Sequence, residues 1–212
     1  MICLFESFED AAHKLSASLL DYKGINDTVI MGILHAGAIM AHTLAQELNL
    51  PWDVLGIKKI GVPFDPELAV GAVAPDGSFY VDEVIKDNFN VAESYIDQTR
   101  HEKLDELVNQ LSQIRGSSSY GNIAHNTIIL TDDGIATGAT MHAAIRFVKA
   151  QGTKAVVVAV PVISMDRLPE FKQEVDKVYA LLVPEDFMGV GEFYTDFTQP
   201  KDSEIAELFK HR

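Results

Sequence analysis

The stretch IILTDDGIATGAT, Ile128 to Thr140, constrains the fold of this chain more than any other feature. Apolar residues run directly into two adjacent carboxylates, Asp132 and Asp133, and small residues with two threonines then lead into a helical pattern from Met141. A short apolar run bounded by turn residues is typical of a buried strand. The stretch therefore predicts a strand, a tight turn and a helix, which is the repeating unit of an α/β fold.

The rest of the chain repeats this alternation of apolar runs and helical patterns. Runs that predict buried strands occupy residues 28–34, 52–57, 126–130, 154–162 and 176–184. Helical patterns occupy residues 5–22, 38–50, 91–114, 138–152 and 165–174, and a short helix follows an aromatic loop near the C-terminus. Strands joined by helical crossovers pair in parallel. We therefore expect an α/β fold with a mainly parallel core sheet.

Residues 58–85 break the alternation. The segment KKIGVPFDPE, residues 58–67, contains two prolines and a glycine and reads as a loop. Residues 68–85 predict two strands around the turn Pro75-Asp76-Gly77. A turn this short joins antiparallel strands.

Length and charge exclude several classes of protein. A chain of 212 residues suits a single domain, 1–212, with a small subdomain. Its formal net charge is −14, from 17 basic and 31 acidic residues, which disfavours binding to nucleic acid or to anionic membranes. An anionic ligand therefore needs a local positive pocket, backbone amides or a metal ion.

The sequence favours a cytoplasmic protein. Its one cysteine, Cys3, leaves no internal disulfide to form, as expected in a reducing cytosol. The first residues lack the cationic start and apolar core of a signal peptide. No apolar run approaches the ~20 residues that span a bilayer. We therefore expect neither a membrane nor a nucleic-acid partner.

The residues after the strand at 126–130 have the chemistry of a phosphate site. Open α/β sheets bind ligands at the carboxyl ends of their parallel strands. Gly134 and Gly138 allow the backbone to approach a ligand closely, and the following helix start offers unpaired N–H groups. Thr137 and Thr140 add hydroxyl donors, so a phosphate monoester fits this turn.

Asp132 and Asp133 require a different partner, because adjacent carboxylates would repel a phosphate. Vicinal hydroxyls or a divalent cation would suit them. A ribose 5-phosphate satisfies both halves, with its phosphate on the turn and its 2- and 3-hydroxyls on the carboxylates. The simpler alternative is a turn in which one aspartate caps the helix.

The stretch 128–140 resembles the phosphoribosyl pyrophosphate signature of type I phosphoribosyltransferases, an apolar strand and two acidic residues before a T-G-x-T/S loop. KKIGVPFDPELAVGAVAPDG, IRFVKAQGTKAVVVAVPV and VGEFYTDFTQ are similar to an uncharacterised bacterial subgroup, so the resemblance covers nearly the full length. It implies a three-layer fold with a mainly parallel five-stranded core sheet. It also implies a flexible flap at about 61–90, a helical insertion at 91–115 and a small hood at about 184–212.

The resemblance also implies ligands and residue roles. The donor would be phosphoribosyl pyrophosphate with Mg²⁺, and the acceptor a nitrogenous base of nucleoside metabolism. Asp132 and Asp133 would hold the ribose hydroxyls and Mg²⁺, and with Lys59 they would be the catalytic residues. The other substrate-binding residues would be His35, Ala36 and Gly37 in the pyrophosphate loop, the basic pair Lys58 and Lys59, and Gly134, Ile135, Ala136, Thr137, Gly138, Ala139 and Thr140 in the phosphate turn.

Two positions depart from the family's pattern. The pyrophosphate loop of this subgroup usually reads Pro-Arg-Gly-Gly, whereas residues 34–37 read Leu-His-Ala-Gly and lack a guanidinium for bidentate phosphate binding. Either a protonated His35 substitutes, which would make binding pH-dependent, or the site has lost catalysis. Ala136 stands where 6-oxopurine transferases have an aspartate, which disfavours a hypoxanthine or guanine acceptor.

Rival readings stay open at this point. A non-catalytic sensor would bind a phosphoribosyl compound or nucleotide and signal through a partner, and the altered loop 34–37 favours it. A phosphatase is disfavoured because Asp132 and Asp133 are adjacent rather than spaced as Asp-x-Asp. Phe187, Phe193, Tyr194 and Phe197 would either stack on a base or pack the C-terminal segment. The charged helix at 91–114 would form either a homodimer surface or a solvated face.

Overall fold

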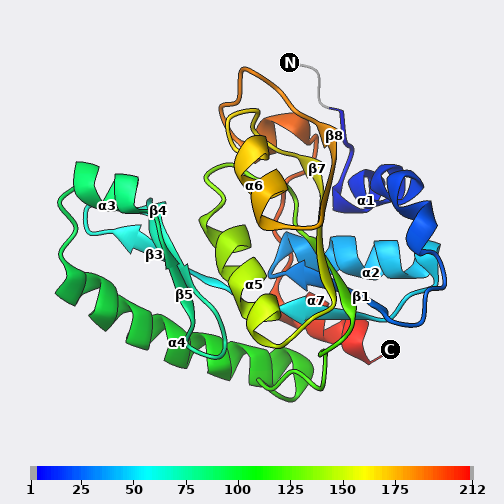
Figure 1. Ribbon diagram of the computed structural model, residues 1–212, viewed down its shortest axis with the longest axis horizontal. Helices are drawn as coiled ribbons and strands as arrows, with labels where there is room; N and C mark the ends of the chain where they lie inside the picture. Colours follow the sequence, from blue (N-terminus) through cyan, green and yellow to red (C-terminus); the bar gives the residue numbers. More distant parts are fainter. Residues whose placement is uncertain (1–3, 211–212) are drawn as a thin grey trace.

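The computed structural model describes residues 4–210 and confirms the α/β class (Figure 1). Its core is a five-stranded sheet in the order β2-β1-β6-β7-β8, and every neighbouring pair is parallel. The strands are β1 (Thr28–Ile33), β2 (Trp52–Leu55), β6 (Thr127–Thr131), β7 (Ala155–Val162) and β8 (Lys177–Leu182). All five expected strand runs therefore form the core sheet.

Helices cover both faces of the core sheet (Figure 1). The helices on one face are α1 (Phe8–Ser16), α2 (Ala36–Leu48) and α7 (Asp202–Phe209), and those on the other are α5 (Ala139–Ala150) and α6 (Leu168–Glu174). Ile129 and Val157 enter the first core, while their neighbours Ile128 and Val158 enter the second. A strand buried on both faces needs apolar residues at every position, which explains the unbroken apolar runs.

The expected burial of the strand at 176–184 was wrong. β8 is the edge strand of the sheet and pairs only with β7. Lys177 is exposed and the remaining residues of β8 are half-buried. An edge position leaves apolar side chains partly uncovered, and sequence hydrophobicity does not report that position.

Residues 58–67 form strands, so the predicted loop was wrong. β3 (Lys58–Val62), β4 (Asp65–Val73) and β5 (Phe79–Val81) make a separate antiparallel sheet, here called the small sheet. Pro63 lies in the turn between β3 and β4, and the β3–β4 register shifts beside Gly61. A Cβ on Gly61 would lie 2.5 Å from the Pro66 carbonyl oxygen, so this irregular pairing needs glycine there.

The end of the predicted second strand is helical instead. Residues Glu83–Asn88 form α3. The Asp82 carboxylate accepts hydrogen bonds from the backbone amides of Val84 and Ile85, both at 3.0 Å, and so caps the helix. This cap overrides the strand preference of the β-branched residues that follow it. The antiparallel pairing of β4 and β5 around the short turn is confirmed.

The long helix α4 (Glu93–Arg115) connects the small sheet to the core (Figure 1). Near its start, Ile96 packs in the apolar cluster of the small sheet. Near its end, Leu107, Leu111 and Ile114 enter the main core. Gly116 ends the helix in a left-handed conformation, φ +75°. Most of the remaining helix surface is exposed, and none of the helices that the structure describes has a span suited to crossing a membrane.

Candidate functional site

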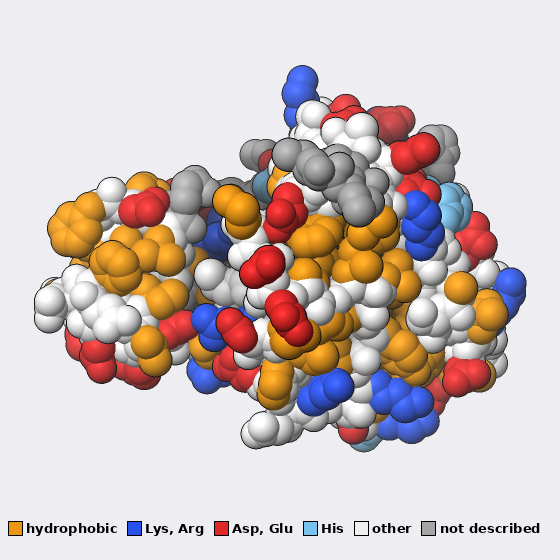
Figure 2. Space-filling view, turned by 90° about the horizontal axis from the view of Figure 1, so that it is seen from above, with side chains coloured by type: hydrophobic (Ala, Val, Ile, Leu, Met, Phe, Trp, Pro, Cys, Tyr) orange, Lys and Arg blue, Asp and Glu red, His pale blue; other side chains and the backbone are white. Residues whose placement is uncertain are grey.

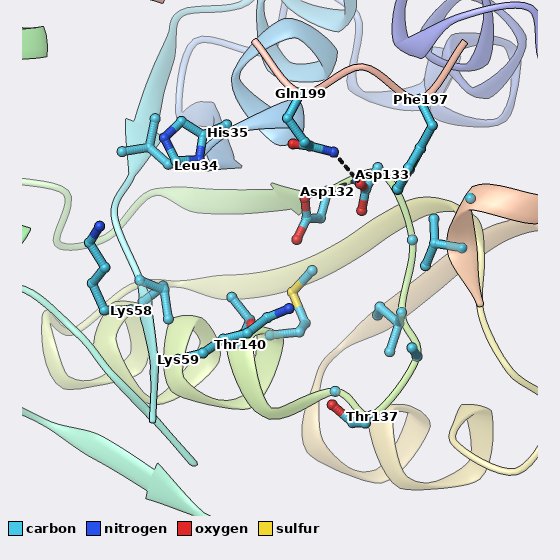
Figure 3. A pocket seen from close by; sticks show the side chains of 18 of the residues that line it. Leu34, His35, Lys58, Lys59, Asp132, Asp133, Thr137, Thr140, Phe197 and Gln199 are labelled. Atoms are coloured by element: carbon cyan, nitrogen blue, oxygen red, sulfur yellow. Dashed lines mark hydrogen bonds between the residues drawn. The ribbon is translucent and has the colours of Figure 1, made fainter. Parts of the chain in front are cut away.

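A pocket of about 570 Å³ lies at the carboxyl ends of β1 and β6, where α2 and α5 begin (Figure 3). Parallel sheets bind ligands at this edge. Most of the residues expected from the sequence line it together: His35, Lys58, Lys59, Asp132, Asp133, Gly134, Ile135, Ala136, Thr137, Gly138 and Thr140. Residues far apart in the chain therefore meet in one cavity.

Ala36, Gly37 and Ala139 do not line this pocket. Ala36 and Gly37 form the first turn of α2 rather than a loop before it, and Ala139 begins α5. A Cβ on Gly37 would lie 2.7 Å from the Thr131 carbonyl oxygen, so only glycine lets α2 start this close to β6. These residues shape the site through backbone packing.

The carboxyl groups of Asp132 and Asp133 are held side by side in an unfavourable setting. Burial and the charge of Asp133 raise the pKa of Asp132 well above its usual range. Burial also raises the pKa of Asp133 to about 6, against lowering contributions from the Gln199 amide and the Lys59 charge. Such a pair gains from a ligand that brings hydroxyl donors or positive charge.

The two lysines begin β3, and their side chains diverge because successive strand residues point to opposite sides. In Figure 3, Lys59 extends toward Thr140, whereas Lys58 points away from it. The Lys59 charge lowers the pKa of both aspartates. Lys59 is therefore the cation directed at the acidic side of the pocket.

The turn from Gly134 to Gly138 is anchored at its middle and open at its end. The backbone amide of Ile135 donates to the Val162 carbonyl oxygen at 2.9 Å, and the Ile135 side chain is buried. Gly138 has φ +87°, and a Cβ there would lie 2.9 Å from the Phe171 ring. Thr137 lies in front of the start of α5. The turn thus presents backbone and hydroxyl groups at a helix N-terminus.

His35 is held by two residues that the sequence did not single out. Its Nε2 lies 2.9 Å from Asp202 Oδ1, on α7. The Gln110 amide, on α4, donates to both oxygens of Asp202 at 2.9 and 3.0 Å. The same Gln110 amide nitrogen lies 3.1 Å from Nε2 of His35, so both residues contact this ring nitrogen. The imidazole is therefore already engaged.

The C-terminal segment closes the pocket and separates the aromatic candidates. Phe197 lines the pocket, whereas Tyr194 is buried and its hydroxyl donates to the Asp133 carbonyl oxygen at 2.7 Å. Phe187 and Phe193 stack on each other with centroids 5.8 Å apart. The Gln199 amide reaches Asp133 Oδ2 at 3.4 Å (Figure 3). One of the four aromatic residues is thus placed to meet a ligand in this pocket.

Sequence reasoning missed the remaining lining residues, namely Leu34, Ile57, Leu107, Gln110, Met141, Val190, Gly191 and Gln199. Leu107 and Gln110 come from α4, and Gln199 from the segment before α7. Isolated glutamines and leucines carry no motif, so no local signal could have identified them.

The acidic pair fits a magnesium ion that is shared with a ligand. Within residues 4–210 no group of three or more His, Cys, Asp and Glu side chains forms a metal cluster. Mg²⁺ is commonly bound through one or two carboxylates plus substrate phosphates and water. Asp132 and Asp133 supply such a pair, and because burial raises the pKa of each, a bound cation would stabilise their ionised forms.

Comparison with known proteins gives consistent matches. The sequence matches the family described as "Phosphoribosyl transferase domain" over residues 5–197. Two Mycobacterium tuberculosis proteins, from strains H37Rv and CDC 1551, bear the provisional name phosphoribosyl transferase and are each 34% identical over 203 residues. The match covers 96% of this chain and 46% of each relative, so the chain spans about half their length. TT1426 from Thermus thermophilus is 30% identical, with a TM-score of 0.78 over 100% of this chain and 99% of that crystal structure.

Proposed function

Because this chain belongs to the phosphoribosyltransferase family, we propose that it transfers a 5-phosphoribosyl group from phosphoribosyl pyrophosphate to a nitrogenous base and releases pyrophosphate. One observation carries the proposal: adjacent carboxylates, a glycine-rich turn at a helix start and a lysine share one pocket. The donor needs these three kinds of group for its ribose hydroxyls, its 5-phosphate and its pyrophosphate.

Asp132 and Asp133 accept hydrogen bonds from the ribose hydroxyls in this proposal. The 5-phosphate lies on the turn 134–140, where backbone amides, the hydroxyls of Thr137 and Thr140 and the start of α5 favour an anion. Held at both ends, the ribose presents C1 in a fixed orientation to the acceptor.

The leaving group meets the cations of β3 and the first turn of α2. As the bond from C1 to pyrophosphate breaks, negative charge gathers on the pyrophosphate oxygens, and Lys59 and Lys58 stabilise it. When bound, Mg²⁺ would neutralise further charge there, and Asp132 and Asp133 are the residues that would hold it. No covalent enzyme intermediate is needed.

The other parts of the chain would enclose the reaction. Residues 61–90, most of the small sheet with α3, act as a flap that excludes water, and residues 91–115 carry the flap as a helical insertion. The hood expected at about 184–212 is described up to residue 210, and in it Val190 and Phe197 offer apolar surface to a flat base. Ala136 cannot transfer a proton, which disfavours a 6-oxopurine as the acceptor.

A non-catalytic sensor is the second candidate, and the state of His35 favours it. Asp202 already holds Nε2 of this imidazole, so the loop offers no guanidinium and a pre-engaged histidine. A protein that kept the ribose 5-phosphate half of the site but lost the pyrophosphate half would bind a phosphoribosyl compound without turnover.

Calorimetry of phosphoribosyl pyrophosphate with and without Mg²⁺, followed by pyrophosphate release with a panel of bases, tests the proposal. We expect metal-dependent binding, and at least about tenfold weaker binding in Asp133→Asn because a charged partner of the ligand is lost. Asp27→Asn is the matched control, since Asp27 pairs with Lys154 outside the pocket.

The outcomes separate the two candidates. Donor binding with pyrophosphate release supports the transferase. Binding of ribose 5-phosphate without any turnover supports the sensor. Unchanged donor binding in Asp133→Asn would remove the role assigned to the acidic pair.

A further inference from the structure

His142, on α5, occupies a closed box of side chains outside the proposed ligand pocket. Its residue surface is 2% exposed. The imidazole is stacked between two rings, with Tyr80 of β5 at 4.6 Å and 19° on one side and Phe171 of α6 at 4.4 Å and 14° on the other. Through these two stacked contacts the buried His142 ring links α5 to β5 and to α6.

Both nitrogens of this imidazole lie close to carboxylates of α6. Nδ1 lies 2.5 Å from Glu174 Oε2 in a hydrogen bond. Nε2 lies 3.1 Å from Glu170 Oε1 at ion-pair distance, although no aligned hydrogen bond satisfies this buried atom. A neutral imidazole has one N–H and would leave a lone pair beside the second carboxylate, whereas an imidazolium carries a proton on each nitrogen. Aromatic faces also favour a cation between them, so the box suits the protonated ring.

The other charged and titratable groups around the box lie one layer further out. The Arg146 guanidinium lies over the Tyr80 ring at 5.0 Å, and Arg167 Nη1 lies 3.5 Å from Glu170 Oε2. Lys149 donates to the Glu174 backbone oxygen. Burial raises the pKa of Tyr80, and the charges of Asp82 and Glu170 raise it further. Glu170 and Glu174 are the only acidic groups of the described residues within 4 Å of the imidazole nitrogens.

The box touches the phosphate turn and the small sheet together. A Cβ on Gly138 would lie 2.9 Å from the Phe171 ring and 3.4 Å from His142 Cδ2, so these rings back the turn directly. On the other side, Arg146 Nη1 donates to the Phe79 carbonyl oxygen at 3.1 Å, beside the Tyr80 ring. The position of β5 and the shape of the turn at Gly138 therefore depend on the same ring.

We propose that His142 is a positioning residue whose protonated ring docks the small sheet against α5 and holds the phosphate turn in its ligand-binding shape. Loss of the proton removes the ring's ion pairs with Glu170 and Glu174 and the attraction of its charge to the Tyr80 face, which weakens the docking of β5. Docking of β5 and affinity at the turn then fall together as pH rises. The second half of this statement rests on the proposed function, because it places a phosphate on the turn.

The test is amide hydrogen exchange of β5 and of residues 134–140 from about pH 5.5 to about pH 8.5, the range in which histidine changes charge. After correction for intrinsic rates, we expect wild-type protection of both segments to fall about tenfold across the range. His142→Phe keeps the stacked ring but has no proton to lose, so its profile at β5 should be flat. Residues 134–140 adjoin Asp133, whose pKa of about 6 falls in the same range, so there the comparison is made in an Asp133→Asn background. His13→Gln is the control, because His13 pairs with Glu47 on the surface of α1 and α2.

Glu174→Gln provides a second variant if His142→Phe does not fold. It keeps the histidine and removes one facing charge, so the fall in protection should move to lower pH. The fall in affinity for ribose 5-phosphate should move to lower pH in the same way. Affinities are compared as the ratio of wild type to variant at each pH, because this ratio cancels the titration of the phosphate itself. A wild-type profile at β5 without pH dependence, or one that His142→Phe retains, would overturn the inference.

The two proposals fail separately. Exchange that titrates as expected while the protein binds neither ribose 5-phosphate nor the pyrophosphate donor counts against the proposed function. Donor binding with pH-independent exchange at β5 counts against the role of His142 alone.

Discussion

At the scale of single residues, the acidic pair Asp132 and Asp133 destabilises the free protein, and in the proposed function a bound ligand would compensate for this. Burial raises the pKa of both carboxyl groups, and for Asp133 it reaches about 6. A carboxyl group whose folded-state pKa exceeds its unfolded value stabilises the fold fully below the unfolded pKa. That contribution is lost as pH rises through the folded pKa.

Asp133→Asn should therefore stabilise the ligand-free protein in a pH-dependent way. The variant should match wild type near pH 4 and exceed it above about pH 6, by on the order of 2 kcal/mol, because asparagine never ionises. Urea unfolding at several pH values measures the difference. Asp27→Asn should not show this pattern, because its exposed carboxylate pairs with Lys154 and its pKa is lowered. A constant offset between Asp133→Asn and wild type would contradict the prediction.

At the scale of secondary-structure elements, the end of α4 is clamped to β2. Arg115 donates from Nε and Nη2 to the two oxygens of Asp53 at 2.7 and 2.6 Å, and the two side chains are only 8% and 14% exposed. The guanidinium also lies over the Tyr120 ring at 4.1 Å, and the Tyr120 hydroxyl accepts from the Gly56 amide. Through this clamp α4 brings Leu107 and Gln110 to the pocket.

Arg115→Ala should cost about 3 to 5 kcal/mol of unfolding free energy, because it leaves the Asp53 charge buried without its guanidinium. Arg115→Lys should lie between this variant and wild type, since an ammonium cannot reproduce the bidentate, stacked geometry. Chemical denaturation measures both values. Lys103→Ala on the same helix removes a surface pair with Glu106 and should change stability by at most about 1 kcal/mol. Equal losses in Arg115→Ala and Lys103→Ala would refute the clamp.

At the scale of the whole molecule, the chain divides into a large body and a thin lobe (Figure 2). The lobe holds the small sheet, and among its described residues the apolar cluster consists of Ile60, Val62, Val70, Val91 and Ile96. Hydrophobic side chains are visible on its surface, and Phe64 is 80% exposed. The clusters on the two faces of the core sheet are much larger. Local stability follows the apolar area that each part buries.

Native-state hydrogen exchange should reveal this division. Amides of β3, β4 and β5 should exchange through local openings, well before those of β6 and β7, which should open only with global unfolding. As denaturant is added, the opening free energies of the β6 and β7 amides should follow the global unfolding free energy, whereas those of the small sheet should stay below it. Equal protection of the two sheets would mean that the lobe is not an independent unit, and the flap assignment would lose its physical basis.

The sequence predicted the core sheet well, because strands buried on both faces must be apolar at every position. It also predicted the turn 132–140, since adjacent acids followed by small residues at a helix start are a local pattern. It failed at residues 58–67, where two prolines suggested a loop although they lie at a turn and an irregular pairing of a hairpin. It failed at α3 because one capping aspartate outweighed the β-branched residues.

By itself, the sequence determined the family and the parallel core, and it suggested the proposed chemistry of residues 128–140, because each depends on residues that are neighbours along the chain. Only the tertiary structure decided that Asp202 and Gln110 hold His35, that Phe197 rather than Tyr194 meets the pocket, and that His142 lies between Tyr80 and Phe171. These contacts join residues far apart in sequence, and ordinary residue types carry no local sign of the partner that folding brings to them. The distances and side-chain directions produced by packing decided which of these contacts form.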